Sequence, residues 1–147
     1  MLNAAGETLR IQTVLASNRA GDREMLEESL AGTPWRLVEA ANLQQAVESL
    51  RRVAIPIVLC DIEFDQLPWR AVLRALRRER RRASVILLSD QGGVELSSEV
   101  IRRGGFDVLT RPFRREEVFP TLVSAYAQCR MPPPYARMPA REVARSF

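Results

Sequence analysis

Short apolar runs recur along the chain, and each has the length of a β-strand. They occupy residues 11–16, 35–38, 57–60, 85–88 and 107–109. The third run has no polar face, which is typical of a central parallel strand covered by helices on both sides. It is followed at once by the carboxylate of Asp61. The pattern therefore predicts five strands, with an acid at the end of the most buried one.

The segments between these runs carry apolar residues with a helical period. Three of them follow the spacing i, i+3, i+4, i+7, which marks one face of a helix. Their residues are Leu43, Ala46, Val47 and Leu50; Trp69, Val72, Leu73 and Leu76; and Phe119, Leu122, Val123 and Tyr126. Two less regular helices are expected around Met25, Leu26 and Leu30 and around Leu96, Val100 and Ile101.

Capping residues support these helices. Asp22 or Asn42 can serve as an N-cap, and Pro68 suits a first helical position. Gly104 and Gly105 mark the end of the fourth helix, because a left-handed C-terminal residue favours glycine.

Strict alternation of strand and helix predicts right-handed crossovers and a parallel sheet with helices on both faces. The expected fold is a doubly wound, five-stranded α/β domain over residues 10–130. Residues 1–9 are expected to form an N-terminal extension, and the Pro- and Arg-rich residues 131–147 a tail or linker. The chain has no long apolar segment and no leader-like N-terminus, which favours a cytoplasmic protein without a membrane span.

Composition removes several chemistries. The chain contains no histidine, and its 22 basic residues are all arginine. Imidazole bases, zinc-binding histidines, Schiff-base lysines and a P-loop are therefore excluded. Only two cysteines occur, Cys60 in a predicted strand and Cys129 in a predicted helix, so neither a disulfide framework nor a metal cluster is expected.

Three polar side chains follow successive predicted strands. Asp61 ends the third, Ser89 the fourth, and Arg111 with Pro112 follows the fifth. In a parallel sheet of this kind the ligand crevice lies at the carboxyl ends of the strands. A carboxylate nucleophile, a hydroxyl and a cation at one such edge suit phosphoryl transfer, which depends on positioned charge. Asp61 could instead cap a turn or pair with Arg111, and Ser89 could be an ordinary strand-end hydroxyl.

On these residues the chain resembles the receiver domains of bacterial two-component response regulators, over residues 10–130. The resemblance implies a flavodoxin-like fold with strand order 2-1-3-4-5 and a signalling module rather than an enzyme. It also implies that Asp61 is the phosphoacceptor, with Ser89 and Arg111 at the family's Ser/Thr and Lys positions. The intervals of 28 residues from Asp61 to Ser89 and 22 from Ser89 to Arg111 are close to those of the family.

The sequence departs from the family at its metal site. Receivers carry a pair of acids after the first strand, where this chain has Ser17 and Asn18. Magnesium favours carboxylate oxygen, so we expect no cofactor, with Mg²⁺ binding weak or lost. Asp22 is judged too far along the loop to be a ligand, and Asp90 is a speculative substitute.

The fifth strand also departs from the family. Arg111 replaces lysine, and it could read phosphate or sit permanently against Asp61. Val108 stands where the resemblance implies an aromatic switch residue, which puts the usual coupling to Ser89 in doubt. The resemblance suggests a cis peptide bond before Pro112, which a sequence cannot establish.

We therefore predict an atypical receiver in phosphorelay signalling, with a phosphorylation-independent interaction module as the alternative. The expected partners are a histidine kinase or phosphotransfer protein and a downstream protein, and homodimerisation is left open. We expect no effector domain after residue 147, and therefore expect output through the surface of the fourth helix, fifth strand and fifth helix. A flavin or nucleotide binder is disfavoured, because the loop SNRAGD has a single glycine.

The arginine-rich run at residues 74–82 has two interpretations. It could bind phosphate, or it could be the solvated end of the third helix, where cations stabilise the helix dipole. No aromatic residue interrupts the run. Nucleic acid is accordingly not an expected partner.

Overall fold

Five parallel strands form one sheet in the order β2-β1-β3-β4-β5. The strands are β1 (Ile11–Ala16), β2 (Trp35–Ala40), β3 (Ile57–Asp61), β4 (Ser84–Ser89) and β5 (Asp107–Thr110). This computed structural model describes residues 10–130, so the predicted N-terminal extension and tail lie outside the described residues. The predicted doubly wound α/β fold and its strand order are confirmed.

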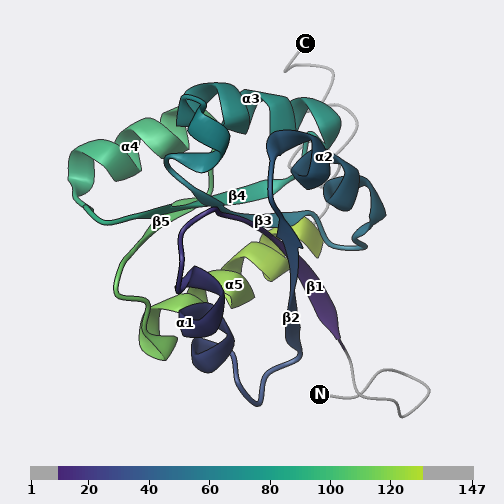
Figure 1. Cartoon of the computed structure of the whole chain (residues 1–147), viewed down its shortest axis with the longest axis vertical. Helices are drawn as coiled ribbons and strands as arrows, with labels where there is room; N and C mark the ends of the chain where they lie inside the picture. The colour runs from purple at the N-terminus through teal and green to yellow at the C-terminus, as the bar shows by residue number, and fades with distance from the viewer. Residues whose placement is uncertain (1–9, 131–147) are drawn as a thin grey trace, which may run out of the picture.

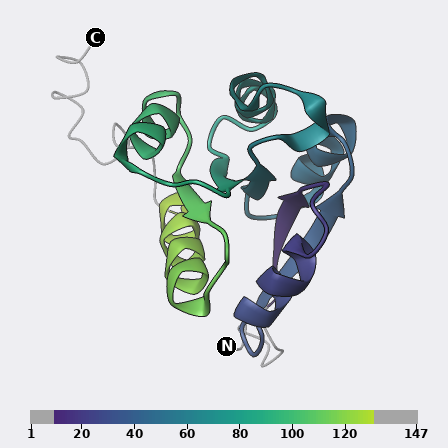
Figure 2. The same ribbon diagram turned by 60° about the vertical axis from the view of Figure 1, so that its left-hand side comes forward.

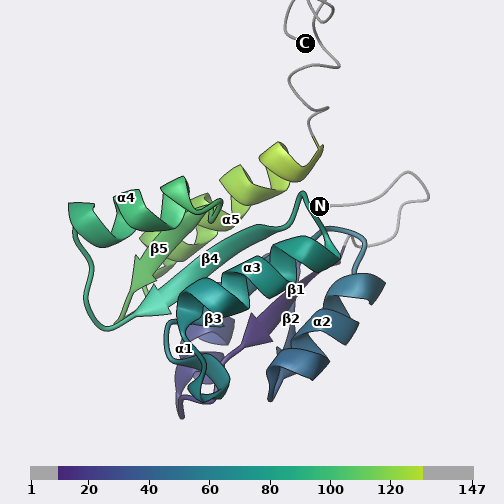
Figure 3. The same ribbon diagram turned by 90° about the horizontal axis from the view of Figure 1, so that it is seen from above.

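Five helices cover the two faces of the sheet (Figure 1). They are α1 (Asp22–Ser29), α2 (Leu43–Arg52), α3 (Trp69–Glu79), α4 (Val94–Arg102) and α5 (Arg115–Arg130), with a short 3₁₀ turn η1 (Phe64–Gln66) after β3. One face carries α2, α3 and α4, and the other carries α1 and α5 (Figure 3). In the turned view, β5 runs between α4 and α5 (Figure 2).

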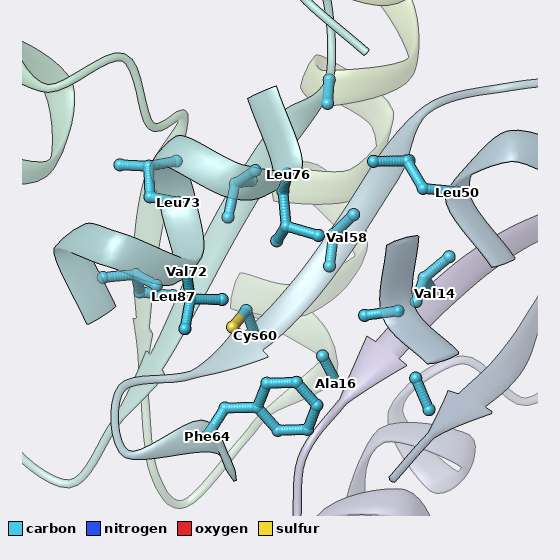
Figure 4. Close-up of a cluster of buried hydrophobic side chains, with 14 of the residues drawn as sticks. Val14, Ala16, Leu50, Val58, Cys60, Phe64, Val72, Leu73, Leu76 and Leu87 are labelled. Carbon is cyan, nitrogen blue, oxygen red and sulfur yellow. The ribbon is translucent and has the colours of Figure 1, made fainter. Parts of the chain in front are cut away.

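Two apolar layers hold the helices to the sheet. In the first, β3 residues Val58 and Cys60 pack against Val72 and Leu76 of α3 (Figure 4). In the second, Leu59 and its neighbours pack against α1 and α5. All five residues of β3 are buried. Each fully buried aliphatic side chain contributes about 1.5–3 kcal/mol to the stability of the fold. Because β3 is buried between the two layers, it is the centre of the core.

The helix starts differ in part from the predictions. Asn42 is an N-cap as predicted, because its side chain accepts a hydrogen bond from the backbone N–H of Gln45 at 2.8 Å. Asp22 is not a cap: Gly21 takes that position at φ +89°, and Asp22 is the first residue of α1. Pro68 is the N-cap of α3 rather than its first helical residue, because the helix begins at Trp69.

The buried face of α5 is rotated from the predicted one. Val123 is 42% exposed, whereas Val118 and Ala125 are buried beside Leu122. On α4, Val100 is buried but Ile101 is 59% exposed. The predicted helices are present, but some of the residues that apolar spacing predicts to be buried are exposed.

A glycine closes α4 and lets another side chain come near. Gly104 has φ +94°, a conformation that suits glycine, as predicted for the end of this helix. The guanidinium of Arg77, from α3, lies where a side chain at position 104 would begin. Glycine is therefore favoured here for its backbone angle, and a side chain at this position would also make the flexible end of Arg77 move.

Candidate functional site

The carboxyl ends of β1, β3, β4 and β5 bring together five charged side chains, which we call the strand-end cluster. Its members are Arg19, Asp22, Asp61, Asp90 and Arg111. Asp61 is the last residue of β3, and Arg111 directly follows β5. The sheet thus places these two predicted site residues side by side, although they are 50 residues apart.

Arg111 is the centre of this cluster. Its Nη2 donates to Asp61 Oδ1 at 2.7 Å and to Asp22 Oδ2 at 2.8 Å, and its Nε donates to Asp22 Oδ1 at 2.9 Å. The arginine side chain is 8% exposed, and those of Asp22 and Asp61 are 2% and 3% exposed. One buried guanidinium is therefore shared by two buried carboxylates, an arrangement in which each ion depends on the others.

Asp22 reaches the cluster because of where α1 begins. Gly21 turns the chain in a left-handed conformation, and Asp22 then starts the helix beside the sheet edge. Its Oδ2 also accepts a hydrogen bond from the Ser17 hydroxyl at 2.6 Å. Burial by itself raises the pKa of Asp22, but the hydrogen bonds from Arg111 and Ser17 outweigh it and hold the pKa below the ordinary value. The hydrogen bond to Asp22 in turn raises the pKa of Arg111.

An outer ion pair lies at the mouth of the cluster. Arg19 donates to both oxygens of Asp90, at 2.9 and 3.1 Å. Asp90 also lies 3.4 Å from Nη1 of Arg111, and its side chain is 58% exposed. The hydrogen bond from Arg19 is the main reason that the pKa of Asp90 is lowered. This pair links the loop after β1 to the loop after β4.

Ser89 lies at the end of β4 but does not join the ion pairs. Its hydroxyl accepts a hydrogen bond from the backbone N–H of Gln91 at 3.1 Å, and its carbonyl accepts one from the N–H of Arg111 at 2.8 Å. The side chain is buried. Ser89 therefore shapes the loop that carries Asp90 and sets the start of the segment that carries Arg111.

The residues present do not fit a divalent metal between the acids. The guanidinium of Arg111 already donates to Asp22 and Asp61, so a metal would have to displace it. The Ser17 hydroxyl donates to Asp22. The Asn18 side chain donates to the carbonyl of Ala41 at 2.7 Å and accepts from the N–H of Asp65 at 3.1 Å. Within residues 10–130 no group of three or more acids or cysteines is placed to hold a metal ion.

Three further residues complete the picture of the site. Val108 is partly buried against the apolar layer beneath α4. The peptide bond between Arg111 and Pro112 is cis. Burial raises the pKa of the Cys60 thiol to about 12, so this cysteine behaves as a packing residue rather than a nucleophile.

Sequence reasoning misses two members of the cluster, Arg19 and Asp22. Asp22 stands well along the loop after β1, yet the turn at Gly21 brings its carboxylate back to the sheet edge. One signal was available in the sequence. A glycine followed by an acid at a helix start can place a carboxylate at the carboxyl end of the preceding strand.

Comparisons with known proteins show what this chain is similar to. A family model described as the response regulator receiver domain matches residues 16–122. The transcriptional regulatory protein ZraR of Klebsiella oxytoca is 26% identical over 107 residues, covering 73% of this chain and 24% of that protein. The probable transcriptional regulatory protein TcrX of Mycobacterium tuberculosis is 30% identical over 95 residues, covering 65% of this chain and 41% of that protein.

Solved structures match over most of the described part. NtrX from Brucella abortus aligns with a TM-score of 0.71 at 19% identity, over 82% of this chain and 28% of that one. The chemotaxis response regulator CheY4 of Vibrio cholerae aligns with a TM-score of 0.67 at 16% identity, over 79% and 98%. At such identities the structures show a shared fold. The chain spans less than half the length of the curated relatives above, and no helix within residues 10–130 is long and apolar enough to cross a bilayer.

Proposed function

The chain belongs to the response regulator receiver domain family, and on that premise we propose that it is an atypical receiver in which Arg111 replaces the metal. Asp61 is the phosphoacceptor position, and Arg111 is the cation that neutralises it. One observation carries this proposal: Nη2 of Arg111 donates to Asp61 and Asp22 at the same time. The cluster thereby sets a cationic side chain of its own against the carboxylate of Asp61.

The chemistry of transfer follows from this arrangement. A carboxylate oxygen of Asp61 would attack the phosphorus of a phosphohistidine on a partner kinase or phosphotransfer protein. The P–O bond forms as the P–N bond breaks, and the imidazole leaves and takes up a proton. Arg111 can turn its Nη2 hydrogen bond from Asp61 to a phosphoryl oxygen while its Nε still holds Asp22. Without a metal clamp we expect transfer to be slower, by on the order of a thousandfold, than in a receiver that holds the metal.

Intact-mass spectrometry after incubation with acetyl phosphate tests this proposal. We expect slow labelling, abolished in Asp61→Asn and insensitive to Mg²⁺. The triple variant Ser17→Asp, Asn18→Asp, Arg111→Lys should label faster and respond to Mg²⁺. Rapid, Mg²⁺-dependent labelling of the unaltered chain would refute the replacement of metal by Arg111. Absence of labelling even in the repaired variant would refute Asp61 as an acceptor.

A second candidate is a receiver that works by docking without phosphorylation. The hydrogen bond from Nη2 of Arg111 to Asp61 Oδ1 favours it, because it holds Asp61 in a buried ion pair. Binding of the downstream partner distinguishes the two functions. A docking module keeps its affinity for that partner in Asp61→Asn, whereas a phosphorelay receiver loses the change in affinity that phosphorylation produces.

We further propose that output passes through α4, β5 and α5. Apolar side chains are exposed on this surface: Val94 is 82% and Ile101 is 59% exposed on α4, and Val123 is 42% exposed on α5. Exposed aliphatic groups of this kind suit a protein partner. Ile101→Ser should weaken binding of that partner and leave labelling of Asp61 unchanged.

A further inference from the structure

Six arginines line an open groove between α3 and α4, which we call the arginine groove. They are Arg70, Arg74, Arg77, Arg78, Arg81 and Arg103. The groove has a volume of about 460 Å³. Both helices lie on the same face of the sheet (Figure 3). The groove is separate from the strand-end cluster, because it shares no residue with it.

The charges in the groove are mostly uncompensated. Glu99 is its acidic neighbour, and it is held by Arg70 at 2.6 Å and Arg103 at 2.9 Å. The hydrogen bond from Arg70, followed by that from Arg103, lowers the pKa of Glu99 to about 2, so this carboxylate is fully charged at neutral pH. Six guanidinium groups less one carboxylate leave about five positive charges.

Three of these arginines have no anionic partner among residues 10–130. Arg74, Arg78 and Arg81 are exposed and form no ion pair there. A fourth, Arg77, donates from Nη2 to the backbone carbonyl of Arg81 at 3.0 Å and forms no ion pair in the described part of the chain. Guanidinium groups held together without anionic partners favour an incoming anion, and their planar fork matches the oxygens of a phosphate.

The arrangement favours a linear anion. Arg70, Arg74, Arg77 and Arg78 occur at helical spacing on one side of α3, so they form a row that rises about 12 Å along the helix. Arg81 extends the row beyond the helix, and Arg103 faces it from the end of α4. A small anion would cover only part of such a row, whereas a chain of repeated phosphates can follow it.

The lining decides between kinds of polyanion. An acidic peptide gains much of its affinity from aromatic or aliphatic anchors, and a single nucleic-acid strand from bases stacked on aromatic rings. The groove is lined by arginine alone. We propose that the arginine groove binds the phosphate backbone of duplex nucleic acid without regard to sequence. This revises the expectation from the sequence, in which the role of Arg70 and Arg103 was not visible.

The test is fluorescence anisotropy of a labelled DNA duplex of mixed sequence, titrated with the full chain over a series of salt concentrations. Five charges predict that the logarithm of the association constant falls with the logarithm of salt concentration with a slope of about −4 to −5. The triple variant Arg74→Gln, Arg78→Gln, Arg81→Gln should reduce the magnitude of this slope by about three and weaken binding roughly tenfold or more.

A matched control removes three charges elsewhere. Arg10, Arg52 and Arg114 are exposed and lie outside the groove. Their triple change to Gln should alter the slope by no more than about one. Circular dichroism should show both variants folded, and Arg74→Gln with Arg78→Gln provides a milder version of the first.

Several outcomes would overturn the proposal. These are absence of duplex binding at low salt, and equal loss of affinity in the groove variant and the control. Tighter binding of a single strand than of the duplex would exclude the duplex as occupant. Competition by polyglutamate as effective as that by DNA would show that the groove recognises carboxylates instead.

Discussion

The strand-end cluster and the arginine groove use the same cation in opposite ways. In the cluster, one buried arginine is shared by Asp22 and Asp61, and an outer pair covers it. In the groove, only Arg70 and Arg103 of the six arginines hold a carboxylate, that of Glu99, and most of the six are exposed to solvent. The difference teaches that arginine content alone predicts little. The acids around each guanidinium decide whether it holds the protein together or remains available to a ligand.

Removing the shared cation should have the largest effect on stability. Arg111→Met leaves Asp22 and Asp61 buried without a positive partner, and we expect a loss of about 3–5 kcal/mol in the free energy of unfolding. Urea denaturation measures it. Arg114→Met, at an exposed neighbouring position, is the matched control and should change stability little. A loss below about 1 kcal/mol for Arg111→Met would mean that the cluster does not depend on its cation.

Removing one of the two acids should cost less. Asp22→Asn keeps the shape of the side chain but weakens two hydrogen bonds from Arg111, and we expect a loss of about 1.5–3 kcal/mol. Thermal and urea unfolding of the variant measure the loss. Glu24→Gln, on the same helix and exposed, serves as the control. An unchanged midpoint would show that Asp61 alone can satisfy Arg111.

The titration of Asp22 should contribute to the pH dependence of the free energy of unfolding. The hydrogen bonds from Arg111 and Ser17 hold its pKa in the folded chain below the ordinary value of an aspartate, so the unfolded chain binds more protons in this range. Stability therefore rises with pH there: the contribution of Asp22 is present above about pH 4–5 and is lost as pH falls through the folded pKa. Denaturation from pH 7 to pH 2.5 should show the difference between the parent chain and Asp22→Asn shrinking with acid. A constant difference would contradict the ion pair.

The smallest effect is expected in the arginine groove. The triple change Arg74→Gln, Arg78→Gln, Arg81→Gln removes exposed charges that have no acidic partner within residues 10–130, and Gln has a helix propensity close to that of Arg. The free energy of unfolding should change by less than about 1 kcal/mol. Urea denaturation in low and high salt checks this. A loss as large as that of Arg111→Met would mean that these arginines are structural and would erase the contrast between the two regions.

Much of the fold could be predicted because burial on both faces leaves a plain trace in the sequence. The five apolar runs gave the strands to within two residues at each end, and Trp69, Val72, Leu73 and Leu76 gave the buried face of α3. The face of α5 was harder. Its apolar residues are spread around the helix, so Val123 and Val118 could not be told apart by spacing.

The candidate site was predicted only in part, for a similar reason. Asp61 ends β3 and Arg111 follows β5. Parallel strands place the residues at their carboxyl ends along one edge of the sheet. The membership of Asp22 depends on a left-handed turn at Gly21, and that of Arg19 and Asp90 on the paths of two loops. Loop paths are set by tertiary contacts, which leave no periodic pattern in the sequence.

The contact between Arg77 and Gly104 limits the order in which the two positions can change. Any side chain at position 104 would begin where the guanidinium of Arg77 lies, and it would also have to adopt a positive φ. Replacing Gly104 first therefore costs mainly the strained φ, together with a movement of the flexible end of Arg77, and replacing Arg77 by a shorter residue first removes the second part. The effects of the two substitutions should be non-additive to that extent. With a short residue at position 77, only the positive φ would restrict the residue at position 104.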